Sequence, residues 1–188
     1  MKVRGLGGLA GLTLLAAFAV HAATTRENVD LAAATRTLSA RALEFPVKGF
    51  ETALRDNFDE RRGNVPHEAL DIMAPRGTAV VAVDDGTIAK LFKSVAGGIT
   101  IYQFDPTQTL AYYYAHLDRY APGLEQGAKV RRGQVIGYVG STGNARADAP
   151  HLHFTVYALG PARQWWKGVA INPYRQLAAP SDASTRGQ

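Results

Sequence analysis

Two histidines separated by a single residue, His151 and His153, are the sharpest chemical feature of the sequence. If this segment is a β-strand, both imidazoles point to the same face, with Cα atoms roughly 6.6 Å apart. One imidazole can then bind a metal ion while the other lies beside an open coordination position. Such a pair also occurs by chance on protein surfaces, and the alternation does not decide which histidine is the ligand.

A second candidate pair is His67 and Asp71. Zinc binds histidine nitrogen and aspartate oxygen at about 2.0–2.2 Å, whereas a fully extended chain would separate these residues by roughly 13 Å. The chain must therefore bend between them, and Pro66 suits such a loop. Alone, this spacing is also that of a surface ion pair. Together with one histidine of the first pair it supplies three ligands, the number typical of a catalytic zinc that keeps a water molecule.

His116 is the third candidate and lies in a tyrosine-rich run that reads as a strand. A period of two places Tyr112, Tyr114 and His116 on one face. The alternative is a partly buried histidine that hydrogen-bonds to a backbone carbonyl. Beyond residue 22 the sequence has four histidines, each at or beside the edge of a predicted strand, and a common site accounts for all of them.

The composition limits how such a site is built. The chain of 188 residues has no cysteine, which excludes a disulfide framework, thiol catalysis, cysteine-ligated zinc and iron–sulfur clusters. A metal site must therefore use histidine, aspartate and glutamate. With 46% hydrophobic and 20% charged residues, the chain is not a disordered polyelectrolyte.

Residues 1–22 have the order of a secretory signal peptide: a basic start, an apolar run from Leu6 to Val20, and small residues before Ala23. An uncleaved amino-terminal anchor is the alternative; with cleavage, no stable membrane span is expected. Cleavage leaves 19 bases against 16 acids, a formal charge of +3 that suits weak attraction to an anionic cell wall. The charges are interspersed, so nucleic acid is not an expected partner.

Residues 23–44 are predicted to form a helical appendage, with a helix over 26–43 capped by Thr24, Thr25 or Asn28. Residues 45–177 are predicted to form a β domain, and residues 178–188 a disordered tail. Asp84-Asp85-Gly86 is a hairpin signal. Many short strands predict a mainly β fold, an antiparallel sandwich or a partly open barrel. The expected strands are 70–73, 79–83, 87–92, 99–104, 110–117, 134–139 and 152–158.

The motifs, taken in order, resemble those of the lysostaphin-type zinc metallopeptidases, cell-wall endopeptidases that include the LytM-like enzymes. The resemblance runs from about Phe45 to Tyr174. It rests on His67-x3-Asp71, Pro75 to Gly86, Tyr114-Ala115-His116-Leu117, Val130 to Gly137, Gly140-Ser141-Thr142-Gly143 and Pro150-His151-Leu152-His153-Phe154.

The resemblance implies an antiparallel β fold with a groove that holds one zinc ion. It implies that His67, Asp71 and His153 are the metal ligands. His116 and His151 are then the pair that act on the water and the transition state, one as general base and the other as a donor to the oxyanion, without a choice between the two assignments.

The sequence departs from the family at three places. Ala69 stands where such enzymes usually have glycine, which predicts backbone strain at the bend. The segment 144–149 is longer than usual, and Thr155 replaces a common acidic residue. Both of these changes are expected to alter the groove wall.

Three further residues are candidates for substrate binding: Arg61, Tyr114 and Asn144. Arg61 lies six residues before His67, but a solvated loop arginine is the favoured interpretation. Trp165 and Trp166 either stack on glycan or pack within a connecting segment, and packing is favoured.

The expected function is zinc-dependent hydrolysis of peptidoglycan peptide cross-links, with the peptide stems as partner and an exported, periplasmic or envelope location. One alternative is an inert relative that binds or activates cell-wall amidases after losing zinc ligands, although here all three ligands are present. Another is a secreted protease that acts on ordinary proteins.

Overall fold

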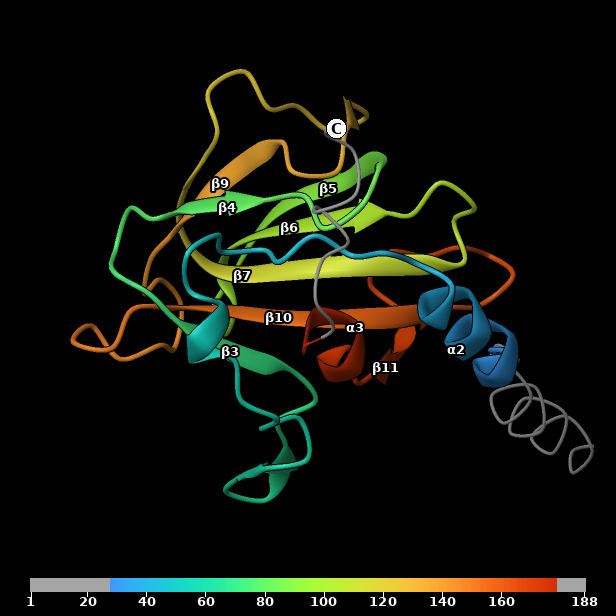
Figure 1. Cartoon of the computed structure of the whole chain (residues 1–188), viewed down its shortest axis with the longest axis horizontal. Helices are drawn as coiled ribbons and strands as arrows, with labels where there is room; N and C mark the ends of the chain where they lie inside the picture. Colours follow the sequence, from blue (N-terminus) through green and yellow to red (C-terminus); the bar gives the residue numbers. More distant parts are fainter. Residues whose placement is uncertain (1–27, 179–188) are drawn as a thin grey trace, which may run out of the picture.

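The computed structural model describes residues 28–178 and shows a mostly β structure with antiparallel strand pairing (Figure 1). The strands of this part of the chain are β1 (Arg61–Arg62), β2 (Val65–Pro66), β3 (Leu70–Met73), β4 (Ala79–Val81), β5 (Gly86–Ser94), β6 (Gly98–Phe104), β7 (Leu110–Tyr120), β8 (Lys129–Val130), β9 (Val135–Val139), β10 (His151–Leu159) and β11 (Gly168–Ile171). The helices are α2 (Leu31–Ser39), a 3-10 turn η1 (Glu51–Ala53) and α3 (Tyr174–Ala178).

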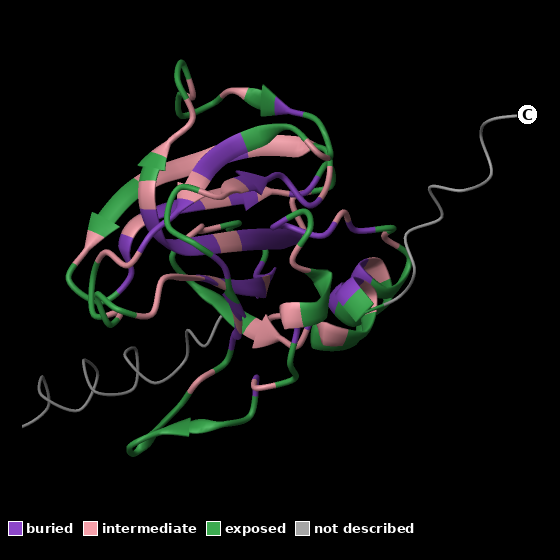
Figure 2. Cartoon of the chain, turned by 60° about the vertical axis from the view of Figure 1, so that its left-hand side comes forward, coloured by how far each residue is buried: buried purple, intermediate pink, exposed green. Residues whose placement is uncertain are grey.

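The long strands form one sheet in the order β11-β10-β7-β6-β5-β8. Strand β3 adds to this sheet by pairing with β10, and β9 pairs with both β7 and β4. Because the path ends at β11 on one side and at β8 on the other, the sheet is not closed into a barrel. This arrangement confirms the predicted mainly β, antiparallel fold class. Strands β1 and β2 form a separate hairpin that projects from the body below β3 (Figures 1 and 2).

The core lies on one face of the long sheet, and strand β10 shows how the sequence selects that face. Its alternate residues Leu152, Phe154 and Val156 are fully buried. Of the residues at the other alternate positions, His151, His153 and Tyr157 are only partly buried, and Thr155 is buried. Burying alternate apolar side chains removes them from water and turns the intervening residues to the other face. Buried residues, in purple, lie mainly in the middle of the long strands, and exposed residues, in green, concentrate in the hairpins and connections (Figure 2).

Helix α2 is shorter than predicted because Asp30 caps it. The Asp30 carboxylate accepts a hydrogen bond of 2.8 Å from the N–H of Ala33, which satisfies one of the free donors at the helix start. The expected caps Thr24 and Thr25 lie outside the described residues. Ala34 and Leu38 are 1% exposed and join the core, so this helix packs onto the β structure.

All seven predicted strands are present, with ends that shift by a few residues. The hairpin predicted at Asp84-Asp85-Gly86 is wrong, because β4 pairs with β9 while β5 pairs with β6 and β8. The prediction omitted β1, β2, β8 and β11.

The carboxyl-terminal helix α3 ends at Ala178, the first residue of the predicted tail. The rest of that tail, 179–188, and the predicted signal peptide lie outside the described residues. Between residues 28 and 178, no helix combines the length and the apolar character needed to cross a membrane.

Candidate metal centre and groove

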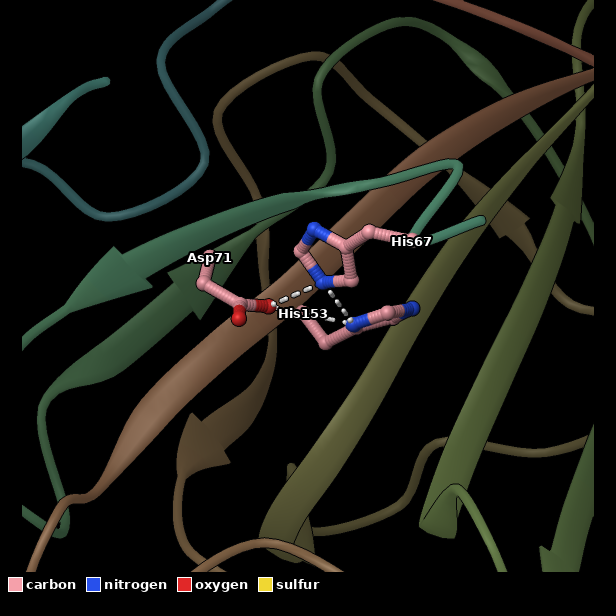
Figure 3. Close-up of side chains that lie close together, drawn as sticks. All are labelled: His67, Asp71 and His153. Atoms are coloured by element: carbon pink, nitrogen blue, oxygen red, sulfur yellow. Dashed lines mark hydrogen bonds and ion pairs between the residues drawn. The ribbon is translucent and has the colours of Figure 1, made fainter. Parts of the chain in front are cut away.

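Three side chains from distant parts of the chain converge at one point (Figure 3). Nε2 of His67 lies 3.0 Å from Oδ1 of Asp71 and 3.2 Å from Nδ1 of His153, and that Nδ1 lies 3.1 Å from the same Oδ1. A tetrahedral zinc ion with ligand bonds of about 2.0–2.1 Å places its donors about 3.3 Å apart. The separation of these three donors and their chemistry, two imidazoles and one carboxylate, therefore fit a zinc site with an open position.

The pairing of β3 with β10 places two of the three candidate ligands. Asp71 and His153 are directly opposite each other in this antiparallel ladder. Opposed residues project to the same face with Cβ atoms about 4.5–5.5 Å apart, so the register by itself brings the carboxylate and the imidazole together.

His67 reaches the same point through a sharp bend before β3. Glu68 has a positive φ of 53°, and its N–H donates a hydrogen bond of 2.9 Å to the carbonyl of Phe58. This left-handed residue reverses the path that an extended chain would take. The strain predicted at Ala69 is wrong: Ala69 is fully buried, and the left-handed conformation falls one residue earlier.

Asn57 supports two of the ligands, and no pattern in the sequence pointed to it. Its carbonyl accepts a hydrogen bond of 2.9 Å from Nδ1 of His67, and its side-chain Oδ1 accepts one of 3.2 Å from the N–H of Asp71. Because the Asn57 carbonyl holds the Nδ1 proton, Nε2 is the ring atom of His67 left to bind a metal ion, and it faces the donor atoms of Asp71 and His153.

His116 and His151 lie beside the ligands. Their ring centroids are 4.9 Å apart, and the ring of His116 is 5.4 Å from that of His153. The Nδ1 of His116 donates a hydrogen bond of 2.8 Å to the carbonyl of Thr142, and the Nδ1 of His151 donates one of 2.8 Å to the carbonyl of Ala149. Each ring therefore keeps Nε2 for chemistry, and Nε2 of His151 lies 3.6 Å from Oδ1 of Asp71.

The predicted face of His116 is wrong in one respect. Tyr112 and Tyr114 do share a face, but it is the core face, and Tyr114 is 0% exposed with its hydroxyl donating to Gln103. His116 has a positive φ of 58° next to a register shift in the β6–β7 ladder, and this turns its ring to the face of His153. The prediction that Tyr114 contacts substrate is therefore wrong, because its side chain is sealed in the core.

Burial and hydrogen bonding set the protonation of these groups. Burial alone would raise the pKa of Asp71, but hydrogen bonds from His153 and His67 outweigh it and hold the pKa well below its usual range. For His67, burial is the largest single influence and lowers the pKa, but the hydrogen bonds with Asp71 and Asn57 and the charge of Asp71 together raise it more, so the net shift is upward. Burial lowers the pKa of His116 to about 4, although the hydrogen bond to Thr142 opposes this shift. Because of this low pKa, the ring is neutral at neutral pH.

The ligands line a groove with a volume of about 810 Å³. Of the two neighbouring arginines, Arg62 lines this groove, and its guanidinium lies 3.0 Å from Oδ2 of Asp71. Arg61 instead donates a hydrogen bond of 2.8 Å to the carbonyl of Asn64 within its own hairpin. Alternation along the short β1 strand explains why the two side chains diverge. The structure agrees with the favoured interpretation of Arg61 as an exposed loop arginine and not with its candidacy for substrate binding, and no pattern in the sequence pointed to Arg62.

Asn144 lies on the groove wall together with Ala145, Arg146 and Ala149, so the long 144–149 segment does shape the groove. Thr155 does not: it is 0% exposed within β10, and its replacement of an acidic residue changes the buried sheet.

Comparison with known proteins places this arrangement among peptidases. The model of "Peptidase family M23" matches residues 65–173, which contain all five site histidine and aspartate residues. The chain is 31% identical over 150 residues to the L-Ala--D-Glu endopeptidase of Bacillus subtilis (strain 168), an alignment that covers 76% of this chain and 44% of the relative. It is 35% identical over 138 residues to the peptidoglycan DD-endopeptidase ShyC of Vibrio cholerae, covering 70% of this chain and 29% of that protein. The chain thus spans less than half the length of these relatives.

The fold comparison gives the same result. The catalytic domain of lysostaphin from Staphylococcus simulans superimposes with a TM-score of 0.60 at 26% identity, covering 72% of this chain and all of that domain. A zinc-containing peptidase from Vibrio cholerae superimposes with a TM-score of 0.56, covering 71% of this chain and 40% of that one. The resemblance seen in the sequence is therefore confirmed, and the chain belongs to peptidase family M23.

Proposed function

We propose that this protein is a zinc-dependent endopeptidase that hydrolyses peptide cross-links of peptidoglycan in the cell envelope. The observation that carries the proposal is the convergence of three ligand side chains, with two further imidazoles beside them, in one groove. Two relatives, an L-Ala--D-Glu endopeptidase and a peptidoglycan DD-endopeptidase, support the substrate class.

His67, Asp71 and His153 would hold the metal. Zinc bound there supplies a Lewis acid that polarises a carbonyl and lowers the pKa of water from about 15.7 to about 7. Asp71 brings a single negative charge, and its low pKa keeps that charge in place, so the metal's positive charge is only partly neutralised.

His116 and His151 would perform the proton chemistry. Both rings donate Nδ1–H to backbone carbonyls, so both have Nε2 free to accept or share a proton. One ring would accept the proton of the attacking water at Nε2, and the other, in the imidazolium form that carries a proton on both nitrogens, would donate a hydrogen bond from Nε2 to the oxyanion of the tetrahedral intermediate. Their fixed backbone partners preorganise both rings, so no reorientation is needed during the reaction.

The groove suits an acidic peptide. Its lining includes three arginines, Arg55, Arg62 and Arg146. Arg62 pairs with Asp71 and Glu60 and Arg146 with Asp148, whereas Arg55 donates to the backbone carbonyls of Thr52 and Leu54. Peptide stems with free carboxylates would be attracted to such a surface. Asn144 on the opposite wall is a candidate for hydrogen bonds to the substrate backbone. The leader-like residues 1–22 support delivery of the enzyme to the envelope.

The test is a digest of purified, cross-linked sacculi. Purified protein should contain about one zinc per chain and convert cross-linked muropeptides to monomers, and chelation should abolish this activity until zinc is restored. The His153→Ala variant serves as the inactive control. Zinc-free protein that leaves sacculi intact but stimulates an amidase would instead establish the inert activator. Efficient cleavage of casein without cleavage of sacculi would establish a protease of ordinary proteins.

A further inference from the structure

A continuous tract of aromatic rings runs from the metal centre across the open face of the sheet. Starting at His153, successive ring centroids are 6.1 Å apart to Tyr113, 4.6 Å to Tyr102, 4.8 Å to Trp165 and 5.2 Å to Trp166. We call the four residues that follow His153, together with Tyr157 and Phe92 beside them, the aromatic tract. Tyr157 is 6.0 Å from Tyr113, and Phe92 is 5.4 Å from Trp165.

Strand register places the tract on the same face as the ligands. Tyr102 is directly opposite Tyr113 in the β6–β7 ladder, and Lys90 is directly opposite Tyr102 in the β5–β6 ladder. The tract therefore crosses β7, β6 and β5, which lie side by side (Figure 1), perpendicular to the strands. The connection between β10 and β11 then lays Trp165 over it.

The far end of the tract is open to solvent. Trp165 packs against Tyr102 and Phe92, as expected for a connecting segment, but Trp166 remains 61% exposed and Phe92 41% exposed. Phe92 and Trp166 each contact Trp165, so the three rings form an apolar patch that is partly exposed to solvent, and exposed apolar patches of sufficient size mark interaction sites. The edge-to-face stacking of Trp166 on Trp165 holds the exposed ring in a defined orientation without burying it.

We propose that the aromatic tract binds the sugar rings of a glycan strand, and thereby presents the attached peptide to the metal centre. The inference rests on the proposed function, because only a substrate made of both peptide and sugar can occupy the metal centre and the aromatic tract together. The carbon face of a pyranose ring packs on an aromatic ring, and its hydroxyls bond to polar groups at the ring edges. The tract offers indole and phenyl faces at its far end, and along it the phenol groups of Tyr102 and Tyr113, which hydrogen-bond to each other, and of Tyr157.

A sugar fits this surface better than a second stretch of peptide does. Extended peptides bind sheets by pairing with the free backbone groups of an edge strand. The tract crosses the face of β7, β6 and β5, where the backbone groups are paired within the ladders. Side-chain rings are therefore the surface that this face presents, and they favour a ligand recognised by stacking.

The chain carries its own probe for this site. Its two tryptophans are Trp165 and Trp166, so intrinsic tryptophan fluorescence reports on the aromatic tract alone. Metal-free protein titrated with peptide-free glycan strands of alternating N-acetylglucosamine and N-acetylmuramic acid should show a saturable change in this fluorescence. A synthetic stem peptide without sugar should produce a much smaller change. A response to the stem peptide and none to the glycan would overturn the proposal and make the tract a peptide site.

Substitution of Trp166 tests the same site by calorimetry. Trp166→Ala should weaken glycan binding about tenfold, and Trp166→Tyr should restore most of it, because the stacking face is kept. Val135→Ala is the control, because it removes an apolar side chain that is 38% exposed on β9 and is not part of the aromatic tract. This variant should bind glycan as the parent does. Equal affinities for Trp166→Ala and Val135→Ala would refute the inference.

The two proposals can fail separately. Glycan binding is measured on metal-free protein, whereas the proposed hydrolysis is measured on cross-linked muropeptides with zinc present. If the protein cleaves muropeptides but does not bind glycan strands, the proposed role of the aromatic tract is refuted and the proposed hydrolase activity stands. If both hold, Trp166→Ala should lower the ratio of the rate on intact sacculi to the rate on glycan-free cross-linked peptide.

Discussion

The guanidinium of Arg62 donates a hydrogen bond of 3.0 Å to Oδ2 of Asp71, while Oδ1 of the same carboxylate faces His67 and His153. The two oxygens therefore have separate partners. An arginine that holds one oxygen fixes the plane of the carboxylate and presents the other oxygen to a metal ion.

Arg62→Ala should weaken zinc binding by about 10–100-fold, the usual effect of losing a group that orients a ligand. Competition with a chromophoric chelator measures this affinity directly. Arg61→Ala is the matched control, because Arg61 is the neighbouring residue of the same hairpin and bonds to Asn64 instead. Equal zinc affinities for the two variants would contradict the role assigned to Arg62.

Asp71→Ala and His153→Ala should each abolish stoichiometric zinc binding, because either change leaves only two of the three donors. Elemental analysis of the purified variants gives the result. Asp118→Ala, which removes an acidic side chain that pairs with Arg76 and Arg119, controls for loss of charge and should keep its zinc. Full zinc occupancy in Asp71→Ala would show that the cluster is not the metal site.

His116→Ala and His151→Ala should each reduce hydrolysis by about 10²–10⁴-fold while zinc content stays at the parent level. The two rings are held by separate carbonyls, those of Thr142 and Ala149, so each can be removed without disturbing the anchor of the other. Zinc content and rate are measured on the same samples. If a variant loses zinc together with activity, the substituted histidine is a metal ligand, and its assignment to proton chemistry is incorrect.

Gly143→Ala should destabilise the fold and lower activity. Gly143 has a φ of +78°, and an added Cβ would collide with the backbone oxygen of Ala96. Relief of this collision moves Thr142, whose carbonyl anchors His116. Gly123→Ala is the matched control: its φ is +73°, but no atom lies within 4 Å of the added Cβ.

Chemical denaturation separates these two glycine variants. Gly123→Ala should lose only the conformational cost of about 1 kcal/mol, and Gly143→Ala more than that. Equal losses of unfolding free energy, with equal activities, would rule out the steric role of Gly143.

Alkaline pH should lower the free energy of unfolding. Burial, with the neighbouring Tyr102 and Glu68, raises the pKa of Tyr157 to about 12, and burial likewise raises the pKa of Tyr112 and Tyr114. In the unfolded chain these phenols ionise near pH 10. The contribution of these phenols to the free energy of unfolding is therefore complete below about pH 10 and is lost as the pH rises toward 12. For Tyr157 the loss is at most about 3 kcal/mol.

Urea unfolding at about pH 8 and about pH 11 measures this loss. Tyr157→Phe keeps the ring but has no ionisable group, so its unfolding free energy should fall less between the two pH values. An identical fall in the parent and in Tyr157→Phe would show that Tyr157 does not contribute.

The sequence by itself determined most of the strands and the types of the site residues. Alternation along residues 152–158 is a local property, because a strand between core and solvent must bury every second side chain. The same alternation placed His151 and His153 on one face, as observed. The motif order was enough to indicate the peptidase family, since a family pattern requires no knowledge of which strands pair.

The family resemblance named residues that should meet, but only the tertiary structure shows how they are brought together. That Asp71 lies opposite His153 depends on the register of β3 against β10, which joins segments 82 residues apart and leaves no trace in local periodicity. The left-handed turn at His116 belongs to a register shift against the neighbouring strand, so strict alternation assigned its ring to the wrong face and Tyr114 to the substrate. The choice of Arg62 over Arg61 likewise depends on how a two-residue strand is turned, because too few residues are present for a repeating pattern to fix its orientation.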